Sequence, residues 1–159
     1  MNWTTFAEKA QVHVLMHASN IQIQAIAPEL TYELRHQVLW PDRPITYVIL
    51  EEDFEGLHYG AIQNDQVMGV ISVFQDGEKY RFRKFAVHPN HQGKGVGSAL
   101  LRHVIKEMYG RSVPQLWCDA RVTAIPFYER FGMKPGGAIF YKGEIAYTRF
   151  VLDLNTHVL

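Results

Sequence analysis

The pattern of apolar and polar positions predicts a β-meander in the first half of the chain. Residues 21–27, "IQIQAIA", alternate apolar and polar side chains, as a half-buried strand does. Two β-favouring runs, 57–63 and 66–74, flank the dipeptide "ND", which predicts a tight hairpin. A third run, 80–87, follows after "DGEK". Strands joined by such short connections must pair antiparallel.

Apolar residues recur at helical spacing in three further segments. The first is 3–17, within an N-terminal extension (1–20) that we expect to be helical. Pro28 opens the second, whose apolar positions are Leu30, Leu34 and Val38. The third follows a glycine-rich stretch and is expected to end with Gly110 as its cap; its apolar stripe is Leu101, Val104, Ile105 and Met108. Residues 41–56 carry two prolines and an acidic run, and we expect a loop there.

One parallel crossover joins the meander to the second half of the chain. Strand 80–87, the glycine-led helix and the strand "QLWCD" (115–119) make a right-handed βαβ unit. Another helix ends at Gly132, and "EIAYTRFVLDL" is a final strand. Without internal repeats or linkers, we expect one domain over 21–159. The predicted fold class is α+β: a central, mostly antiparallel twisted sheet with one parallel βαβ crossover, flanked by helices.

The stretch "HPNHQGKGVGS" (88–98) has three glycines in five positions between a strand and a helix. The N-terminus of a helix presents unpaired N–H groups and a partial positive charge, and both favour phosphate. Glycine lets the backbone approach the phosphate oxygens, and Lys94 adds a cation. The stretch therefore predicts a pyrophosphate site, against the alternative of a turn that merely uses glycines.

Two nucleotide-binding motifs fit this stretch less well. A Walker A loop requires Gly-Lys-[Ser/Thr] at a fixed distance from an earlier glycine, and that spacing is missing. A dinucleotide fingerprint would use Gly93, Gly95 and Ser98, with Asp119 ending the next strand. That fingerprint follows its strand directly in a parallel sheet, whereas residues 88–92 intervene here and the preceding strands are hairpins. Dinucleotide binding is therefore the third-ranked function.

"FAVHPNHQGKGVGSALL" resembles the acetyl-CoA-binding motif of the GNAT superfamily of N-acetyltransferases, whose pattern is Gln/Arg-x-x-Gly-x-Gly/Ala. Gln92, Gly95 and Gly97 occupy that pattern. "ARVTAIPFYERFGM" resembles the second motif of the family, in which a helical tyrosine precedes Gly-Phe; the matching residues are Tyr128, Gly132 and Met133. The order of strands and helices from about residue 21 onward also matches the family.

The resemblance implies acetyl-CoA as co-substrate and a role for each matching position. Backbone groups of Phe85 and Val87, at the splayed end of their strand, would pair with the pantetheine arm. Amides from Gln92 to Ser98 would hold the pyrophosphate, and Tyr128 would stand near the thioester sulfur. The implied cofactor-binding residues are Phe85, Ala86, Val87, Gln92, Gly93, Lys94, Gly95, Val96, Gly97, Ser98 and Arg121.

Two positions depart from the family pattern. Family members often carry an asparagine three residues before the alanine of the second motif; this chain has Arg121 there, which could still reach a phosphate. Pro126 cannot donate a helical hydrogen bond, so its helix is expected to start near Thr123 with the proline in the first turn.

Attack of an amine on a thioester needs a neutral amine, a donor for the developing oxyanion and a proton for the departing thiolate. An alkylammonium has a pKa near ~10.4, so a base or a water relay must remove its proton. The Val87 N–H is the candidate oxyanion donor. Tyr128, with a reference pKa of ~10, is the candidate proton donor; the other interpretation is a half-buried packing residue.

The general base is not evident from the sequence. His58 is one candidate, against a structural role in its strand. An acidic run in the preceding loop either forms a solvated surface or attracts a cationic amine; it comprises Glu51, Glu52, Asp53 and Glu55. We expect acceptor specificity to lie in the loop 36–56 and in residues 136–144.

We expect no metal and no reactive cysteine. His13 and His17 lie four residues apart but lack the glutamate of an HExxH motif. Cys118, the single cysteine, lies in an apolar strand, which favours a buried and inert thiol over a nucleophile. One cysteine cannot form an internal disulfide, which fits a reducing cytoplasm.

Composition narrows the range of partners. Sixteen Lys and Arg balance 16 Asp and Glu in 159 residues, so no charge field suggests nucleic acid or a membrane surface. The longest apolar run, "VMGVISVF", is far shorter than the ~20 residues that span a bilayer, and the N-terminus lacks the basic region of a signal peptide. We expect a cytoplasmic protein whose partner is a small-molecule or peptide amine; the sequence leaves a homodimer open.

Two functions from different classes remain. The first is an enzyme: an acetyl-CoA-dependent N-acetyltransferase that acts on a primary amine by direct attack in a ternary complex. The second is a non-catalytic acyl-CoA-binding module that senses the cofactor without turning it over. The presence of Tyr128 favours the enzyme, whereas the lack of an evident base keeps the sensor open.

Overall fold

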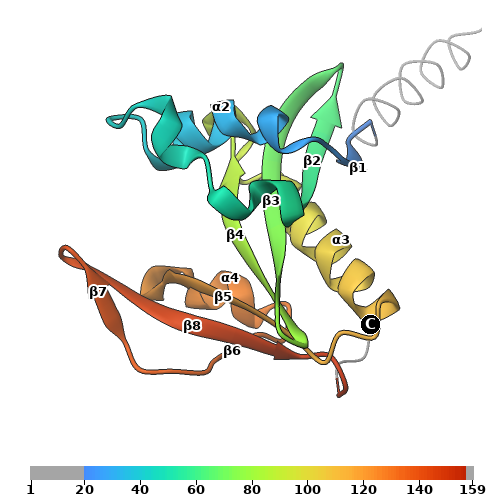
Figure 1. Cartoon of the computed structure of the whole chain (residues 1–159), viewed down its shortest axis with the longest axis vertical. Helices are drawn as coiled ribbons and strands as arrows, with labels where there is room; N and C mark the ends of the chain where they lie inside the picture. Colours follow the sequence, from blue (N-terminus) through green and yellow to red (C-terminus); the bar gives the residue numbers. More distant parts are fainter. Residues whose placement is uncertain (1–19, 157–159) are drawn as a thin grey trace, which may run out of the picture.

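The structure, a computed structural model, describes residues 20–156. Eight strands form one sheet in the order β1-β2-β3-β4-β5-β8-β6, and β7 pairs with β8 (Figure 1). Every pair is antiparallel except β4 with β5. This arrangement confirms the predicted α+β class with one parallel crossover. The predicted helix 3–17, with His13 and His17, lies outside the described residues.

The antiparallel meander consists of β1 (Gln22–Ala25), β2 (Leu57–Gln63), β3 (Gln66–Asp76) and β4 (Lys79–Val87). Between β2 and β3, Asn64 and Asp65 have φ angles of 50° and 60°. Positive φ at both central residues marks a type I′ turn, whose twist matches that of a two-residue hairpin. The hairpin predicted from "ND" is confirmed.

The crossover runs from β4 through α3 (Val96–Gly110) to β5 (Gln115–Arg121), which lies parallel to β4. The predicted apolar stripe of the helix is buried: Leu101, Val104, Ile105 and Met108. Gly110 does not cap the helix, because the left-handed residue is Ser112, with a φ of 56°. That turn lets the Val113 N–H reach the Met108 carbonyl at 3.1 Å, which closes the helix end two residues later than predicted.

The second arm of the sheet is built around β8 (Ile145–Asp153), which pairs with β5. The final strand was predicted, but the short strands β6 (Lys134–Pro135) and β7 (Phe140–Lys142) were not. Two or three residues cannot display a period of two, so their pairing depends on β8. Pro126 lies in the first turn of α4 (Ile125–Glu129), after the 3₁₀ turn η6 (Val122–Ala124), as predicted.

The segment after Pro28 is helical, but its hydrogen-bonding pattern changes along its length. The 3₁₀ turn η1 (Pro28–Thr31) leads into α2 (Tyr32–Leu34), and a π-helical turn, η2 (Arg35–Leu39), follows. Of the apolar positions that recur at helical spacing, Leu34 is buried but Leu30 is 55% exposed, whereas Arg35 is fully buried. The Arg35 guanidinium forms an ion pair with a buried carboxylate, as described below.

The predicted loop 41–56 contains two further 3₁₀ turns, η3 (Ile45–Val48) and η4 (Glu51–Glu55). A third, η5 (Pro89–His91), follows β4. Single turns of this kind are too short to show a helical period in the sequence. The loop prediction was therefore wrong for η3 and η4.

The sheet separates two sets of helical segments. On one face, α3 and α4 pack over a large apolar core that includes Leu100, Phe82 and Phe150. On the other, η1, α2 and η2 cover β3 and β4, with Leu34, Val70 and Ala86 in a smaller cluster. The two faces thus carry different chemistry, and residues of β4 alternate between them.

Candidate functional site

Strands β4 and β5 separate shortly after they begin to pair. Their register partners are Tyr80 with Leu116 and Arg81 with Trp117, and within the described chain residues 82–87 have no partner in β5. Figure 1 shows the two strands running apart, so that β1–β4 and β5–β8 form the two arms of a V. Backbone groups along the inner edge of β4 are therefore open to a ligand.

A β-bulge in β4 changes which of its side chains lie on each face of the sheet. Val70 pairs with Ala86 and Ser72 with Arg83, so Lys84 and Phe85 together oppose the single residue between Val70 and Ser72. Lys84 has a φ of 52°, which is uncommon outside glycine. The extra residue reverses the alternation of the strand. Phe85 consequently joins the face covered by α3, and Lys84 lies on the opposite face.

Val87 directs its backbone N–H into the gap between the arms. The N–H of His88 donates to the Met68 carbonyl on β3 at 2.8 Å. Because hydrogen-bonded and non-hydrogen-bonded pairs alternate in an antiparallel ladder, Val87, paired with Gly69, turns its N–H and C=O away from β3. The Val87 carbonyl accepts the side-chain amide of Gln92 at 2.9 Å. This orientation is the one that an oxyanion donor requires.

The glycine-rich stretch leaves the N-terminus of α3 without a cap. Gly93 and Gly95 have φ angles of 70° and 83°, in the left-handed region that favours glycine. Gly95 is the N-cap residue, and no side chain caps the helix. The Ala99 N–H donates to the Gly95 carbonyl at 3.0 Å and begins the helical hydrogen bonding. The N–H groups of residues 96–98 are thus directed outward, toward a potential anion.

A pocket of about 460 Å³ lies between the end of β4, the start of α3 and α4. Its lining residues are Phe85, Val87, His91, Gln92, Gly93, Gly95, Val96, Gly97, Ser98, Phe127 and Arg130. Gly97 is part of the wall, since a Cβ there would lie 3.5 Å from Phe85 Cζ and 3.6 Å from Val87 Cγ2. Apolar side chains beside outward N–H groups and a guanidinium fit a ligand with both an uncharged arm and a phosphate, as acetyl-CoA has.

The pocket gathers eight of the eleven predicted cofactor residues, and three lie outside its lining. The side chain of Ala86 packs with Leu34 and Val70 on the other face of the sheet. Lys94 is exposed beside the lining glycines. Arg121 is exposed at the end of β5. Contacts of these three residues with a cofactor stay predictions.

Sequence reasoning missed three lining residues: His91, Phe127 and Arg130. The Arg130 guanidinium carbon lies 5.3 Å from the centroid of the Phe127 ring. Residues three apart share one face of a helix, so the spacing of Phe127 and Arg130 was a usable signal. Arg130 brings a permanent positive charge to a pocket that already points N–H groups at its ligand.

Tyr128 lies in the core where the two arms meet, and it does not line the pocket. Its ring centroid is 6.0 Å from that of Phe82 on β4 and 4.8 Å from that of Phe150 on β8. Burial raises the pKa of Tyr128 far above its ordinary value, and the neighbouring Cys118 raises it further. The hydroxyl therefore keeps its proton, and the raised pKa also makes it a weaker acid toward a thiolate. Burial likewise raises the pKa of the Cys118 thiol, which fits the expected inert cysteine.

The acidic run is not one solvated surface. Asp53 is fully buried and accepts two hydrogen bonds from the Arg35 guanidinium, at 2.8 and 2.9 Å. Glu52 forms an ion pair with Arg83 on β4, with 2.6 Å between the carboxylate and guanidinium atoms. Neither carboxylate is free to attract a cationic amine, and Asp53 is not solvated. Both interpretations offered by the sequence were wrong for Asp53.

His58 belongs to the same buried network rather than to the pocket. Arg35 donates to the Ser72 hydroxyl at 2.8 Å, and Ser72 Oγ lies 2.7 Å from His58 Nδ1. His58 Nε2 lies 2.7 Å from the Asp53 carbonyl, which accepts its proton. With 4% of its surface exposed and both ring nitrogens engaged, His58 is a structural residue and not the general base.

Residues 20–156 hold no group of three or more His, Cys, Asp and Glu side chains placed to ligate a metal ion. They also contain no helix with the length and apolarity needed to cross a membrane.

The model of the acetyltransferase (GNAT) family matches residues 23–133 of this chain. The "uncharacterized N-acetyltransferase YitI" of Bacillus subtilis is 27% identical over 129 residues, which cover 76% of this chain and 87% of that protein. The family span includes the pocket-lining stretch from Phe85 to Ser98.

Solved structures share the fold. The ribosomal-protein-S18-alanine N-acetyltransferase of Escherichia coli superposes with a TM-score of 0.71 at 21% identity, over 84% of this chain and 94% of that one. A GNAT family acetyltransferase from Elizabethkingia anophelis with acetyl-CoA bound has a TM-score of 0.69 at 16% identity, over 85% of this chain and 99% of that one. At these identities the likeness establishes the fold.

Proposed function

The chain belongs to the acetyltransferase (GNAT) family, and we propose that it transfers the acetyl group of acetyl-CoA to a primary amine of a small molecule or peptide. One observation carries the proposal: the pocket formed by the uncapped start of α3 and the edge of β4, at the point where β5 has turned away. In such a pocket the start of α3 offers N–H groups to phosphates, and β4 offers an open strand edge.

Each part of the pocket has a role in holding the co-substrate. Outward N–H groups of residues 96–98 would bind the pyrophosphate, and Arg130 would add a charge-assisted hydrogen bond. The open edge of β4 at Phe85 and Val87 would pair with the amide-bearing pantetheine arm, as an added strand does. Gln92 supports this edge because its side chain fixes the Val87 carbonyl.

In the proposed reaction, the neutral amine attacks the thioester carbonyl carbon directly. A carbon–nitrogen bond forms, the carbon–sulfur bond breaks, and the amine loses its proton to solvent. The Val87 N–H stabilises the oxyanion, and Tyr128, whose ring centroid lies 5.1 Å from that of the lining residue Phe127, donates its proton to the departing thiolate and regains one from solvent. An acyl-cysteine route has no support, because the single cysteine, Cys118, is 2% exposed and its pKa is raised.

Thiol release from acetyl-CoA, followed across a panel of primary amines, tests the proposed reaction. Initial rates should give intersecting double-reciprocal plots, the pattern of a ternary complex. Parallel plots would instead indicate an acyl-enzyme. Stabilisation by CoA without thiol release from any amine would favour the non-catalytic binding module, and a melting shift with NAD but not CoA would restore the dinucleotide interpretation.

Replacing Gly97 with valine should weaken CoA binding by about 10- to 100-fold, the loss expected when hydrogen bonds to a charged group are disrupted. A Cβ at Gly97 already reaches van der Waals contact with Phe85 and Val87, so two further methyl groups must displace the pocket wall. Calorimetric titration with CoA measures the effect.

Gly110→Val is the matched control, because it makes the same change in the same helix where a Cβ meets no atom within 4 Å. This variant should bind CoA with the affinity of the unaltered protein. Undiminished affinity in Gly97→Val would contradict the assignment of the pocket to the co-substrate.

A further inference from the structure

We propose that the acceptor amine carries an anionic group, a carboxylate or a phosphate, and that Lys84 binds this group. The inference rests on the proposed acetyl transfer and adds the class of acceptor. It assigns a specificity-determining role to a residue that the bulge in β4 displaces from its regular orientation.

In this proposal the acceptor approaches the thioester from the face of β4 that carries Lys84. Its neighbour Phe85 lines the co-substrate pocket on the face covered by α3, while Lys84 lies on the opposite face. That face includes Trp40, whose ring centroid is 5.9 Å from the Lys84 ammonium. An acceptor held there would sit across the strand edge from the pocket.

Among the described residues Lys84 forms no ion pair, although the charge of Asp53 partly offsets the effect of the cations around it. Ion pairs among residues 20–156 are Arg35–Asp53, Arg83–Glu52, Arg111–Glu107 and Arg149–Asp119. Lys84 takes part in none of them. Partial burial lowers the pKa of Lys84, and the positive charges of Arg83, Arg35 and Lys142 lower it further. A half-buried ammonium among like charges favours an anionic ligand as its partner.

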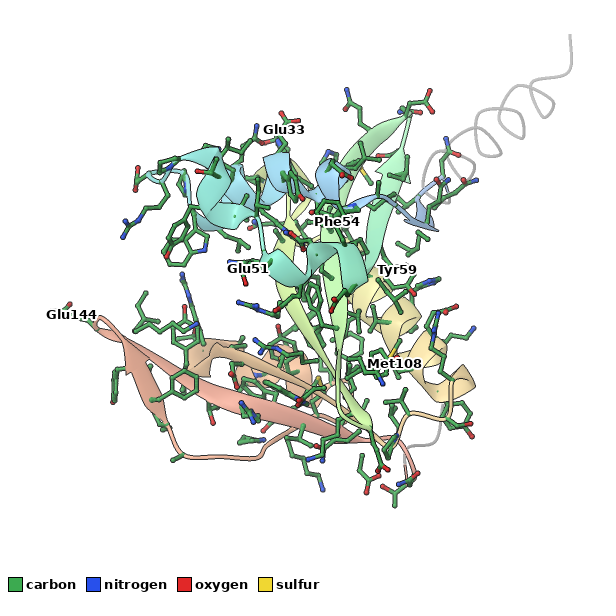
Figure 2. The ribbon with its side chains drawn as sticks, in the orientation of Figure 1. Glu33, Glu51, Phe54, Tyr59, Met108 and Glu144 are labelled. Atoms are coloured by element: carbon green, nitrogen blue, oxygen red, sulfur yellow. The ribbon has the colours of Figure 1, made fainter. Side chains whose placement is uncertain are left out.

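The second arm of the sheet adds positive charge to the same region. Lys142, on β7, is one of the cations that lower the pKa of Lys84, and its ammonium lies 4.6 Å from the centroid of the Tyr147 ring. Two acidic residues lie toward the open end of the V in Figure 2: Glu51 on η4, and Glu144 at the tip of the β7–β8 hairpin. Both are exposed. Two other carboxylates of η4, Glu52 and Asp53, are held in ion pairs with Arg83 and Arg35.

A positive environment also bears on the missing general base. Nearby cations disfavour an ammonium and so lower the pKa of the bound amine. A larger fraction of the acceptor is then neutral and able to attack. The anionic end of the acceptor is attracted to Lys84, whereas a neutral amine is not. The anionic end thus provides binding, and the amine end provides the nucleophile.

Matched pairs of acceptors test the inference: ethanolamine with phosphoethanolamine, and propylamine with 3-aminopropanoate. Thiol release is measured at saturating acetyl-CoA. We expect kcat/KM to be higher for the anionic member of at least one pair, and the pair that responds distinguishes phosphate from carboxylate. Lys84→Gln should reduce the ratio within that pair by about 10- to 100-fold, as loss of a charge-assisted hydrogen bond does. Lys84→Arg should preserve it.

Lys79→Gln is the control, because Lys79 is an exposed lysine at the far end of the same strand. Equal kcat/KM for both members of each pair would overturn the inference, as would a Lys84→Gln variant that slows both members alike. If no amine releases thiol, the proposed function fails separately. The melting shift of CoA-saturated protein with phosphoethanolamine or 3-aminopropanoate then decides: a shift that Lys84→Gln abolishes supports the anion site, and no shift overturns it.

Discussion

Tyr128→Phe is expected to slow acetyl transfer by about 10²- to 10⁴-fold, the usual contribution of a positioned general acid. The variant removes only the hydroxyl and keeps the ring that packs between Phe82 and Phe150. CoA affinity should change little, because the variant keeps the ring and its packing against the lining residue Phe127. The free energy of unfolding should change by no more than about 1 kcal/mol, the net value of an ordinary hydrogen bond.

The pH dependence follows from the raised pKa of Tyr128. Its ordinary value is ~10, and burial lifts it further, so the hydroxyl stays protonated through the neutral and mildly alkaline range. The rate should therefore rise with pH as the acceptor amine loses its proton. Ionisation of Tyr128 should not lower the rate below pH ~10.

Tyr59→Phe is the control for this variant. Tyr59 is also a buried core tyrosine, 5% exposed, but its ring packs against His103 at 4.9 Å, away from the diverging strands. It should leave the rate unchanged. A thioester whose thiol leaves as a stable anion should be less sensitive to Tyr128→Phe than acetyl-CoA. Equal losses with both donors would indicate positioning, and no loss would make Tyr128 a packing residue.

Features that depend on neighbouring residues could be predicted from the sequence. The meander followed from period-two alternation and a turn dipeptide whose two residues adopt positive φ. The crossover followed from the spacing of apolar residues in α3. The phosphate end of the pocket followed from glycines between a strand and a helix, because the chemistry of a helix N-terminus is local, whereas its strand residues were implied by the family resemblance.

Features that depend on distant residues could not be predicted. Arg35 and Asp53 lie 18 residues apart, and the sequence gives no sign that each is the partner that allows the other to be buried. The bulge at Lys84 is equally hidden, because a lysine with a φ of 52° carries no signature of that conformation. A strict alternation along β4, which ignores the bulge, would therefore assign each side chain after Arg83 to the wrong face of the sheet.

Asp53→Asn is expected to destabilise the protein by about 3–5 kcal/mol, the range for removing one partner of a buried ion pair. Arg35 and Asp53 are both fully buried, and the carboxylate also accepts the Leu50 N–H at 2.8 Å. The variant would leave the Arg35 guanidinium in the core without a counter-charge. Denaturant unfolding measures the difference.

Glu52→Gln provides the control because it makes the same chemical change one residue away. The Glu52–Arg83 pair is partly exposed, 42% and 29% for the two side chains, and such pairs contribute about 1 kcal/mol or less. Adding Arg35→Met to Asp53→Asn should recover part of the lost stability, because it removes the uncompensated charge. Equal effects of Asp53→Asn and Glu52→Gln would contradict the importance of burial.

The loss caused by Asp53→Asn should depend on pH in one direction. Burial alone would raise the pKa of Asp53, but the hydrogen bonds from Arg35 and from the Leu50 N–H outweigh it and lower the pKa below its usual range. A carboxylate whose pKa is lower in the folded state stabilises the fold fully above its unfolded value of ~3.9, and this contribution is lost as the pH falls through the folded value. The difference between the original protein and Asp53→Asn should thus be constant near neutrality and shrink in acid. A difference that grew in acid would show that the carboxylate does not hold the Arg35 charge, and that η2 and η4 are joined by packing instead.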